Sequence, residues 1–190
     1  MLIVVTGKIG VGKSTVCRKV VDLLHDRGYS CGGVLTCKDK DGGITVEDVS
    51  TGTSTTLASC NCEYGGPQIG PYFFNPKGLA FSIDSLNRGL GLPLLVIDEI
   101  GHLELEGNGF TNAITLINSQ KTGSCIAVVR DYLLSSFLPL FKSTPLILKT
   151  TAANRNSLPS QMVRILMGSN PTPPDSSASS GIRSIKTLPE

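Results

Sequence analysis

The sequence predicts an α/β fold, in which a largely parallel central sheet is flanked by helices. One observation predicts the sheet and its helices, and a second predicts an insertion. Short apolar runs typical of buried strands alternate along the chain with segments whose apolar residues recur at helical spacing. Residues 31–59 differ, because their short runs are separated by Asp-Gly and Thr-Gly turn signals. That pattern predicts antiparallel hairpins inserted into the fold.

The expected elements follow in a regular order. A buried strand at residues 2–6 is followed by a helix that begins at Ser14 and ends near Gly28, a residue suited to a left-handed cap. Further strands are expected at residues 31–36, 40–49, 51–59, 71–74, 92–98, 125–130 and 145–150. Further helices are expected at residues 76–90, about 110–117, 131–141 and 157–168. Residues 60–70 are expected to form a loop.

The composition is that of one globular domain followed by a tail. Residues 1–168 contain the alternating elements, whereas residues 169–190 hold four prolines, six serines and nearly no apolar residues. We expect this tail to be flexible, because such a composition cannot bury a core. The formal net charge of +2 does not indicate binding to nucleic acid or to a membrane surface.

The location and the redox state follow from what the sequence lacks. No apolar run reaches 18 residues, and the N-terminus has no secretion signal, so a cytoplasmic protein is expected. The six cysteines include no C-x-x-C pair. We therefore expect free thiols rather than a zinc site.

A glycine-rich stretch between the first strand and the first helix carries the clearest chemical signal. It reads GKIGVGKS and fits G-x-x-x-x-G-K-[ST], the phosphate-binding P-loop, in the strand–loop–helix context that the motif requires. Its backbone N–H groups can surround phosphate oxygens, while Lys13 reaches the β- and γ-phosphates and the Ser14 hydroxyl binds Mg²⁺. The phosphate-binding residues predicted here are Gly7, Lys8, Ile9, Gly10, Val11, Gly12, Lys13, Ser14 and Thr15.

A second motif, LLVIDEIG, consists of apolar residues that end in two acids. A buried strand ending at Asp98 places a carboxylate at the edge of the sheet where ligands of α/β proteins bind, and this acid is expected to hold Mg²⁺ with Ser14. Glu99 is then positioned to activate a water as general base. The alternative is that the two acids only begin a solvated loop. The residues expected to line the nucleotide from this side are Val96, Ile97, Asp98, Glu99, Ile100, Gly101, His102 and Leu103.

Two further segments are expected near the nucleotide. Arg130 ends the strand that follows the Asp98 strand, and two roles are open for it: sensing the γ-phosphate or pairing with a loop acid. Asn154 and Arg155 follow the last strand, where the nucleotide base is often approached in this architecture. No N-K-x-D stretch is present, which argues against a guanine-specific switch GTPase.

Taken together, these motifs resemble the THEP-type nucleoside-triphosphatases, called cancer-related nucleoside-triphosphatase in animals. The family motif D-E-I-G-K-M-E-L is followed over residues 98–105 except at His102 and Leu103. The N-R-x-x-L-P stretch begins at Asn154, and residues 33–36 with Gly70 and Tyr72 match the G-F-x-T and V-G-x-Y strands. The likeness covers about residues 1–167.

The resemblance implies a RecA-like core and slow, Mg²⁺-dependent hydrolysis of ATP, GTP and other nucleotides to the diphosphate, with Glu99 as the acid–base residue. The chain departs from the family where an acid and basic residues usually follow G-F-x-T, since these positions read Cys37, Lys38 and Lys40. His102 replaces the lysine of the second motif.

Three functions remain open at this point: a hydrolase, a small-molecule or nucleotide kinase, and a nucleotide-binding accessory protein without hydrolysis. The seven arginines are scattered rather than gathered in the arginine-rich lid usual in nucleotide kinases. The pair of acids at the strand end favours attack by water. The sequence indicates neither the preferred base nor the oligomeric state.

Overall fold

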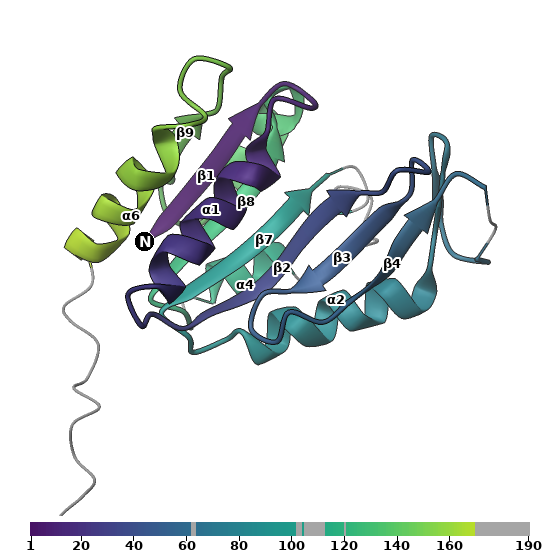
Figure 1. Cartoon of the computed structure of the whole chain (residues 1–190), viewed down its shortest axis with the longest axis horizontal. Helices are drawn as coiled ribbons and strands as arrows, with labels where there is room; N and C mark the ends of the chain where they lie inside the picture. Colours follow the sequence, from purple (N-terminus) through teal and green to yellow (C-terminus); the bar gives the residue numbers. More distant parts are fainter. Residues whose placement is uncertain (62–63, 102–103, 105–112, 120, 170–190) are drawn as a thin grey trace, which may run out of the picture.

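A single nine-stranded sheet forms the centre of the molecule (Figure 1). The structure is a computed structural model, and it describes residues 1–61, 64–101, 104, 113–119 and 121–169. The strands are β1 (Leu2–Gly7), β2 (Cys31–Lys38), β3 (Ile44–Asp48), β4 (Ser54–Ser59), β5 (Gln68–Ile69), β6 (Tyr72–Phe74), β7 (Leu94–Ile100), β8 (Ser124–Arg130) and β9 (Leu146–Lys149). Their order across the sheet is β5-β6-β4-β3-β2-β7-β8-β1-β9.

The sheet consists of a parallel half and an antiparallel half that meet at β2. Strands β2, β7, β8, β1 and β9 pair in parallel. Strands β3, β4, β6 and β5 then extend the same sheet by antiparallel pairing. The predicted α/β class with an antiparallel hairpin insertion is therefore confirmed. The inserted hairpins extend the central sheet by pairing with the edge of its parallel half at β2.

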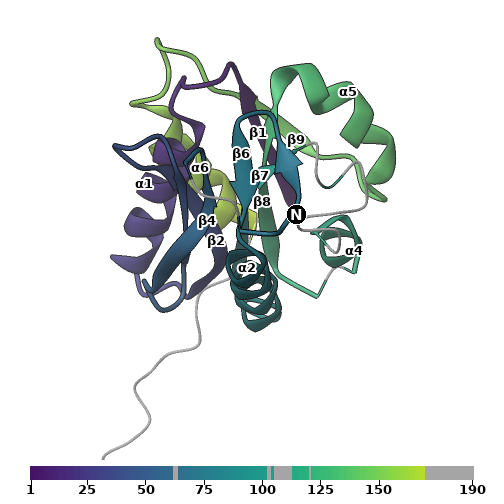
Figure 2. The same cartoon turned by 90° about the vertical axis from the view of Figure 1, so that its right-hand side faces the viewer.

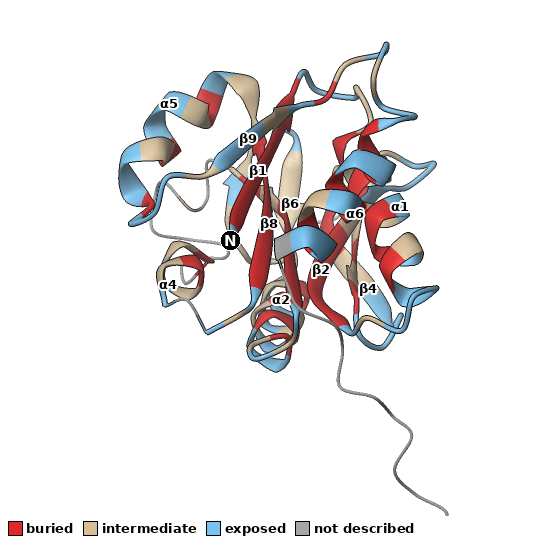
Figure 3. Ribbon diagram, turned by 90° about the vertical axis from the view of Figure 1, so that its left-hand side faces the viewer, coloured by how far each residue is buried: buried red, intermediate tan, exposed pale blue. Residues whose placement is uncertain are grey.

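Helices cover both faces of the sheet (Figure 2). In the described residues they are α1 (Lys13–His25), α2 (Pro76–Arg88), α4 (Ala113–Asn118), α5 (Leu134–Phe137) and α6 (Leu158–Ser169), with 3-10 turns η1 (Asp131–Leu133) and η2 (Leu138–Leu140). Helices α1 and α6 pack together on one face, and α2, α4 and α5 lie on the other. Two apolar cores result, and the central strands between them are almost entirely buried (Figure 3).

Several helix and turn predictions can be compared directly with the structure. Asn75 caps α2, because its side-chain oxygen accepts a 3.0 Å hydrogen bond from the Lys77 amide. A proline occupies the first helical position, and both features agree with the prediction. The helix predicted at 131–141 is present but irregular, because residues 131–140 form η1, α5 and η2 in succession, with a proline inside η2. Residues 60–70 are not wholly loop, since β5 pairs with β6 there. The expected start of the helix near residue 110 and the tail from 170 lie outside the described residues.

Within the part of the chain that the structure describes, no helix is both long and apolar enough to cross a membrane.

Candidate active site

The carboxyl ends of three neighbouring parallel strands bring the predicted site residues together. β1 ends at Gly7, the first residue of the P-loop, and the adjacent β8 ends at Arg130, which is its direct register partner. The next strand, β7, carries Asp98 and Glu99 near its end. Between Ile97 and Ile100 the register of β7 against β8 shifts, and the Asp98–Glu99 peptide bond is cis. The two motifs read from the sequence therefore meet at one edge of the sheet.

The P-loop depends on glycines at positions where a side chain would be strained. Gly7 has φ of +145°, and a Cβ placed there would lie 2.6 Å from the Thr150 carbonyl oxygen. Gly12 has φ of +105° and directly precedes α1. These conformations turn the chain sharply between β1 and α1, as a nest of inward-pointing backbone N–H groups requires.

Lys13 is buried at the start of α1, and its amine folds back onto the first two residues of the P-loop. Its Nζ donates hydrogen bonds to the carbonyl oxygens of Gly7 and Lys8, each at 3.2 Å. The same Nζ lies 3.8 Å from Oε2 of Glu99. A fixed positive charge thus lies between the P-loop and the acid predicted to be the general base.

Asp98 is completely buried and only half satisfied. Its Oδ2 accepts hydrogen bonds from the Thr36 amide at 3.1 Å and the Thr36 hydroxyl at 3.2 Å. Its Oδ1 accepts none from any residue that the structure describes, although the Ser14 hydroxyl lies close enough to the carboxylate to lower its pKa. Burial outweighs these contacts and raises the pKa of Asp98 to about 6.

The donor set of Asp98 and Ser14 fits Mg²⁺. The described residues contain no cluster of three or more His, Cys, Asp or Glu side chains that could enclose a metal by themselves. Mg²⁺ does not require such a cluster, because it is usually held by one or two protein oxygens together with substrate phosphates and waters. A buried carboxylate oxygen without a donor, next to a hydroxyl at the P-loop, provides two oxygens of the required kind.

Glu99 lies between two cations. Its Oε1 accepts a hydrogen bond from Nε of Arg130, while Oε2 faces Lys13. Arg130 also donates from Nη1 to the Tyr132 hydroxyl at 3.3 Å. Burial acts to lower the pKa of Arg130, but Tyr132 and Glu99 raise it above its usual value, so its guanidinium stays charged.

The loop after β9 lies against the P-loop. The Asn154 side chain is used within this loop, since Oδ1 accepts from the Thr151 amide at 2.8 Å and Nδ2 donates to the Lys149 carbonyl at 2.8 Å. Arg155 is exposed, and its Cδ lies 3.8 Å from the position of a Cβ built on Gly12. Of the two residues predicted to contact the base, Arg155 is thus the one with its polar group directed to no described partner.

Other predicted positions lie apart from this centre or outside the described residues. His102 and Leu103 belong to the residues that the structure does not describe. Lys40 is exposed in the turn between β2 and β3, and Lys38 lies 5.8 Å from the ring centroid of Tyr72. Thr36 ends the segment that matches the G-F-x-T strand, and the sequence predicted no role for it in the site. Its distance of 62 residues from Asp98 explains why the sequence alone did not reveal their contact.

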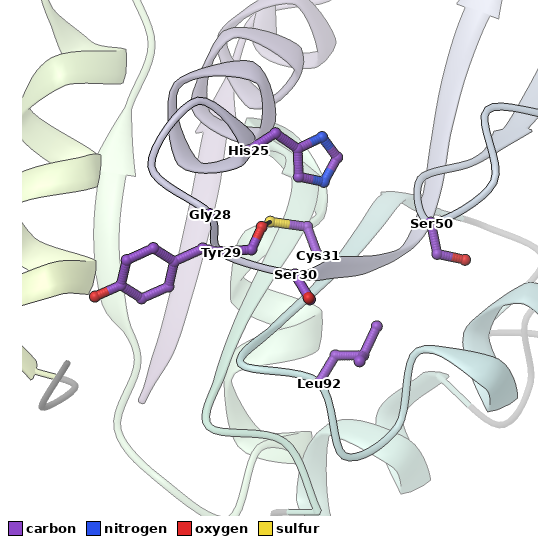
Figure 4. Close-up of a pocket in the computed structure, with 7 residues that line it drawn as sticks. All are labelled: His25, Gly28, Tyr29, Ser30, Cys31, Ser50 and Leu92. Atoms are coloured by element: carbon purple, nitrogen blue, oxygen red, sulfur yellow. Dashed lines mark hydrogen bonds between the residues drawn. The ribbon is translucent and has the colours of Figure 1, made fainter. Parts of the chain in front are cut away.

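A separate pocket of about 450 Å³ lies near the amino ends of β2 and β7 (Figure 4). It is lined by His25, Gly28, Tyr29, Ser30, Cys31, Ser50 and Leu92. In Figure 4 the Tyr29 ring points away from Ser50 and Leu92. No lysine or arginine lines this pocket, so it lacks the charge that a polyphosphate needs, and we place the candidate site at the P-loop.

Comparisons with known proteins agree with this assignment. A family model described as NTPase matches residues 2–163. The nucleoside-triphosphatase THEP1 of Archaeoglobus fulgidus is 31% identical over 174 residues, covering 88% of this chain and 100% of that protein. The THEP1 of Methanosarcina acetivorans is 31% identical over 84% of this chain and 93% of its own length. With the THEP1 of Methanopyrus kandleri, 32% identical, the match spans 64% of that protein.

Two solved structures share the fold. The crystal structure of THEP1 from Aquifex aeolicus superposes with a TM-score of 0.69, at 20% identity, covering 88% of this chain and 99% of that one. The solution structure of a human cancer-related nucleoside triphosphatase gives 0.68, at 22% identity, covering 89% and 98%. On the strength of the family match and the P-loop geometry, the chain belongs to the NTPase family of P-loop enzymes.

Proposed function

We propose that this enzyme hydrolyses nucleoside 5′-triphosphates, ATP and GTP among them, to the diphosphate and phosphate in a Mg²⁺-dependent reaction in the cytoplasm. The observation that carries the proposal is the position of Glu99, whose Oε2 lies 3.8 Å from the P-loop lysine, Lys13. The names of the relatives, nucleoside-triphosphatase THEP1, support the same reaction class.

Phosphate binding follows from the P-loop. Its backbone N–H groups and the N-terminus of α1 surround the β- and γ-phosphates, and Lys13 turns from the carbonyls of Gly7 and Lys8 to the phosphate oxygens. Ser14 and Asp98 are the residues that would hold Mg²⁺. When bound, the metal neutralises charge that develops on the phosphate oxygens.

Glu99 carries the proton-transfer step. A water held by its carboxylate attacks the γ-phosphorus, and the bond from that phosphorus to the β,γ-bridging oxygen breaks. The proton of the water passes to Glu99, and the diphosphate leaves with the electron pair of the broken bond. Lys13 stabilises the negative charge that accumulates on the transferred phosphoryl group.

Recognition of the base is proposed to be permissive. The Asn154 amide is occupied within its own loop, which leaves the flat guanidinium of Arg155 as the side chain available beside Gly12. A guanidinium can stack on any base, because stacking does not read a specific hydrogen-bond pattern. Broad use of nucleoside triphosphates would follow.

Replacing Glu99 by Gln tests the proposed reaction. The substitution keeps the shape of the side chain but removes the base, so single-turnover hydrolysis should fall by about 10²–10⁴-fold. Binding of the Mg²⁺-nucleotide should persist, because Ser14 and Asp98 are unchanged. Phosphate release is measured without any acceptor, which separates hydrolysis from transfer by a kinase.

Glu47→Gln is the matched control. Glu47 also pairs with an arginine, Arg18 at 2.6 Å, but lies on β3 and belongs neither to the P-loop nor to β7. This variant should hydrolyse at the parental rate within about twofold, as expected for a surface pair. Parental turnover in Glu99→Gln would show that water is activated elsewhere and would remove the basis of the mechanism.

A further inference from the structure

We propose that the substrate's own γ-phosphate switches Glu99 on, by drawing Arg130 and Lys13 away from its carboxylate. This inference rests on the proposed function and concerns the regulation of the same site. The structural basis is that the two oxygens of Glu99 face two different cations: Oε1 is bound by Arg130, and Oε2 faces Lys13.

Both oxygens of this carboxylate are engaged. The hydrogen bond from Arg130 uses a lone pair of Oε1 that a water would need, and Lys13 lies 3.8 Å from Oε2. In this arrangement Glu99 is positioned near the P-loop, but its carboxylate is held by the two cations.

Arg130 is placed to exchange partners. It is the register partner of Gly7 on the neighbouring strand, and neighbouring strands lie about 4.8 Å apart. Its side chain is 35% exposed, and its Nη2 donates to no residue that the structure describes. The guanidinium is thus partly exposed, lies next to the first P-loop residue and has a nitrogen from which it can donate to a bound phosphate.

A γ-phosphate is the ligand that favours this exchange. It carries more negative charge than a carboxylate and accepts paired hydrogen bonds from a guanidinium. Lys13, already 3.2 Å from the P-loop carbonyls, turns to the same phosphate. A diphosphate has no γ-phosphate, so it leaves Arg130 on Glu99.

The exchange has a specific consequence for affinity. Arg130 should contribute to the binding of triphosphates but not of diphosphates. Removing the charge of Glu99 should strengthen triphosphate binding, because both cations then reach the phosphate without leaving a partner. The two effects should also be coupled, since they involve the same ion pair.

The experiment measures affinities in the presence of Mg²⁺ for a β,γ-imido nucleoside triphosphate and for the diphosphate. Arg130→Gln should lower triphosphate affinity by about tenfold or more and leave diphosphate affinity within about twofold. Glu99→Gln should raise triphosphate affinity by about two- to tenfold, and this gain should shrink when both substitutions are combined. Arg18→Gln, at a comparably exposed arginine paired with Glu47, should change neither affinity.

Any of three results would overturn the proposal. An equal loss of both affinities in Arg130→Gln, or no loss of either, would show that Arg130 does not move to the γ-phosphate. Weaker triphosphate binding in Glu99→Gln would do the same, and this measurement remains decisive if Arg130→Gln fails to fold. The affinities do not depend on turnover, so an absence of phosphate release by the unmodified enzyme would contradict hydrolysis alone.

Discussion

Two buried aspartates on either side of β2 have opposite environments. Asp48 ends β3 and Asp98 lies in β7, and both side chains are 0% exposed. Asp48 accepts hydrogen bonds from the Ser50 amide at 2.8 Å and hydroxyl at 2.6 Å, and it pairs with Arg88 at 2.6 Å. Among the described residues, the hydrogen bonds found for Asp98 are those that Oδ2 accepts from the Thr36 amide and hydroxyl, and Oδ1 has none.

The pKa values reflect this difference. Burial alone would raise the pKa of both carboxyls, but the donors from Ser50 and Arg88 outweigh it at Asp48 and lower its pKa to about 2. At Asp98 burial prevails, and the pKa rises to about 6. A carboxylate with a full set of donors stabilises the fold, whereas a buried carboxylate with an unbound oxygen is a candidate for binding a ligand that the chain does not supply.

Between the two aspartates, the larger effect is expected from Asp98→Asn. If Oδ1 is reserved for Mg²⁺, the variant should lose metal-dependent nucleotide binding, and turnover should fall on the order of 10²–10³-fold. Phosphate release measured across a Mg²⁺ titration checks this. Asp48→Asn serves as the control and should keep the parental Mg²⁺ dependence below its melting temperature. An unchanged Mg²⁺ dependence in Asp98→Asn would remove the distinction between the two aspartates.

A smaller effect is expected on stability when Asp48 is replaced by Ala. The substitution leaves the Ser50 groups and Arg88 without their acceptor, which should lower the free energy of unfolding by about 2–3 kcal/mol. For a domain of this size that corresponds to a fall in Tm of about 5–10 °C. Arg88→Ala should cost less, about 1–2 kcal/mol, because the buried Asp48 carboxylate loses its cation but keeps the Ser50 donors. Equal Tm values for Asp48→Ala and the parent would contradict a structural role for Asp48.

The smallest expected effect is on the acid side of the stability profile. The folded pKa of Asp48, about 2, lies below its unfolded value of about 3.9, so its ionisation stabilises the fold above about pH 4 and this contribution disappears as the pH falls toward 2. The difference in unfolding free energy between the parent and Asp48→Asn should therefore shrink by about 1–2 kcal/mol between pH 4 and pH 2. Urea unfolding at a series of pH values measures it. A difference that does not vary with pH would mean that Asp48 titrates normally.

The sequence was sufficient for the elements that carry strong local signals. The P-loop spacing, the Asp98–Glu99 pair at a strand end and the Asn75 cap each lie within a few residues, and each is found where the sequence placed it. The helix predicted at 131–141 is found, but its apolar spacing did not reveal that only Leu134–Phe137 are α-helical and that the turns on either side, one of them with a proline at 139, are 3-10.

The contacts that define the site could not be predicted, because they join residues far apart in sequence. The pairing of Arg130 with Glu99, 31 residues apart, depends on β7 and β8 lying side by side. The sequence left two roles open for Arg130, and the structure shows it paired with an acid. Asp48 drew no prediction at all, since an aspartate before a turn resembles many others until Arg88 is brought against it.

The most direct test of the contrast is the thermal unfolding of Asp98→Asn and Asp48→Asn, each in chelator and each with Mg²⁺ and a β,γ-imido triphosphate. Asp98→Asn should melt in chelator at or above the parental Tm, because it removes a buried charge with an unbound oxygen, and it should lose the Mg²⁺-dependent rise in Tm. Asp48→Asn should melt several degrees lower and keep the full rise. If Asp98→Asn melts lower and still gains stability from Mg²⁺, Asp98 is a structural residue and the metal is held elsewhere.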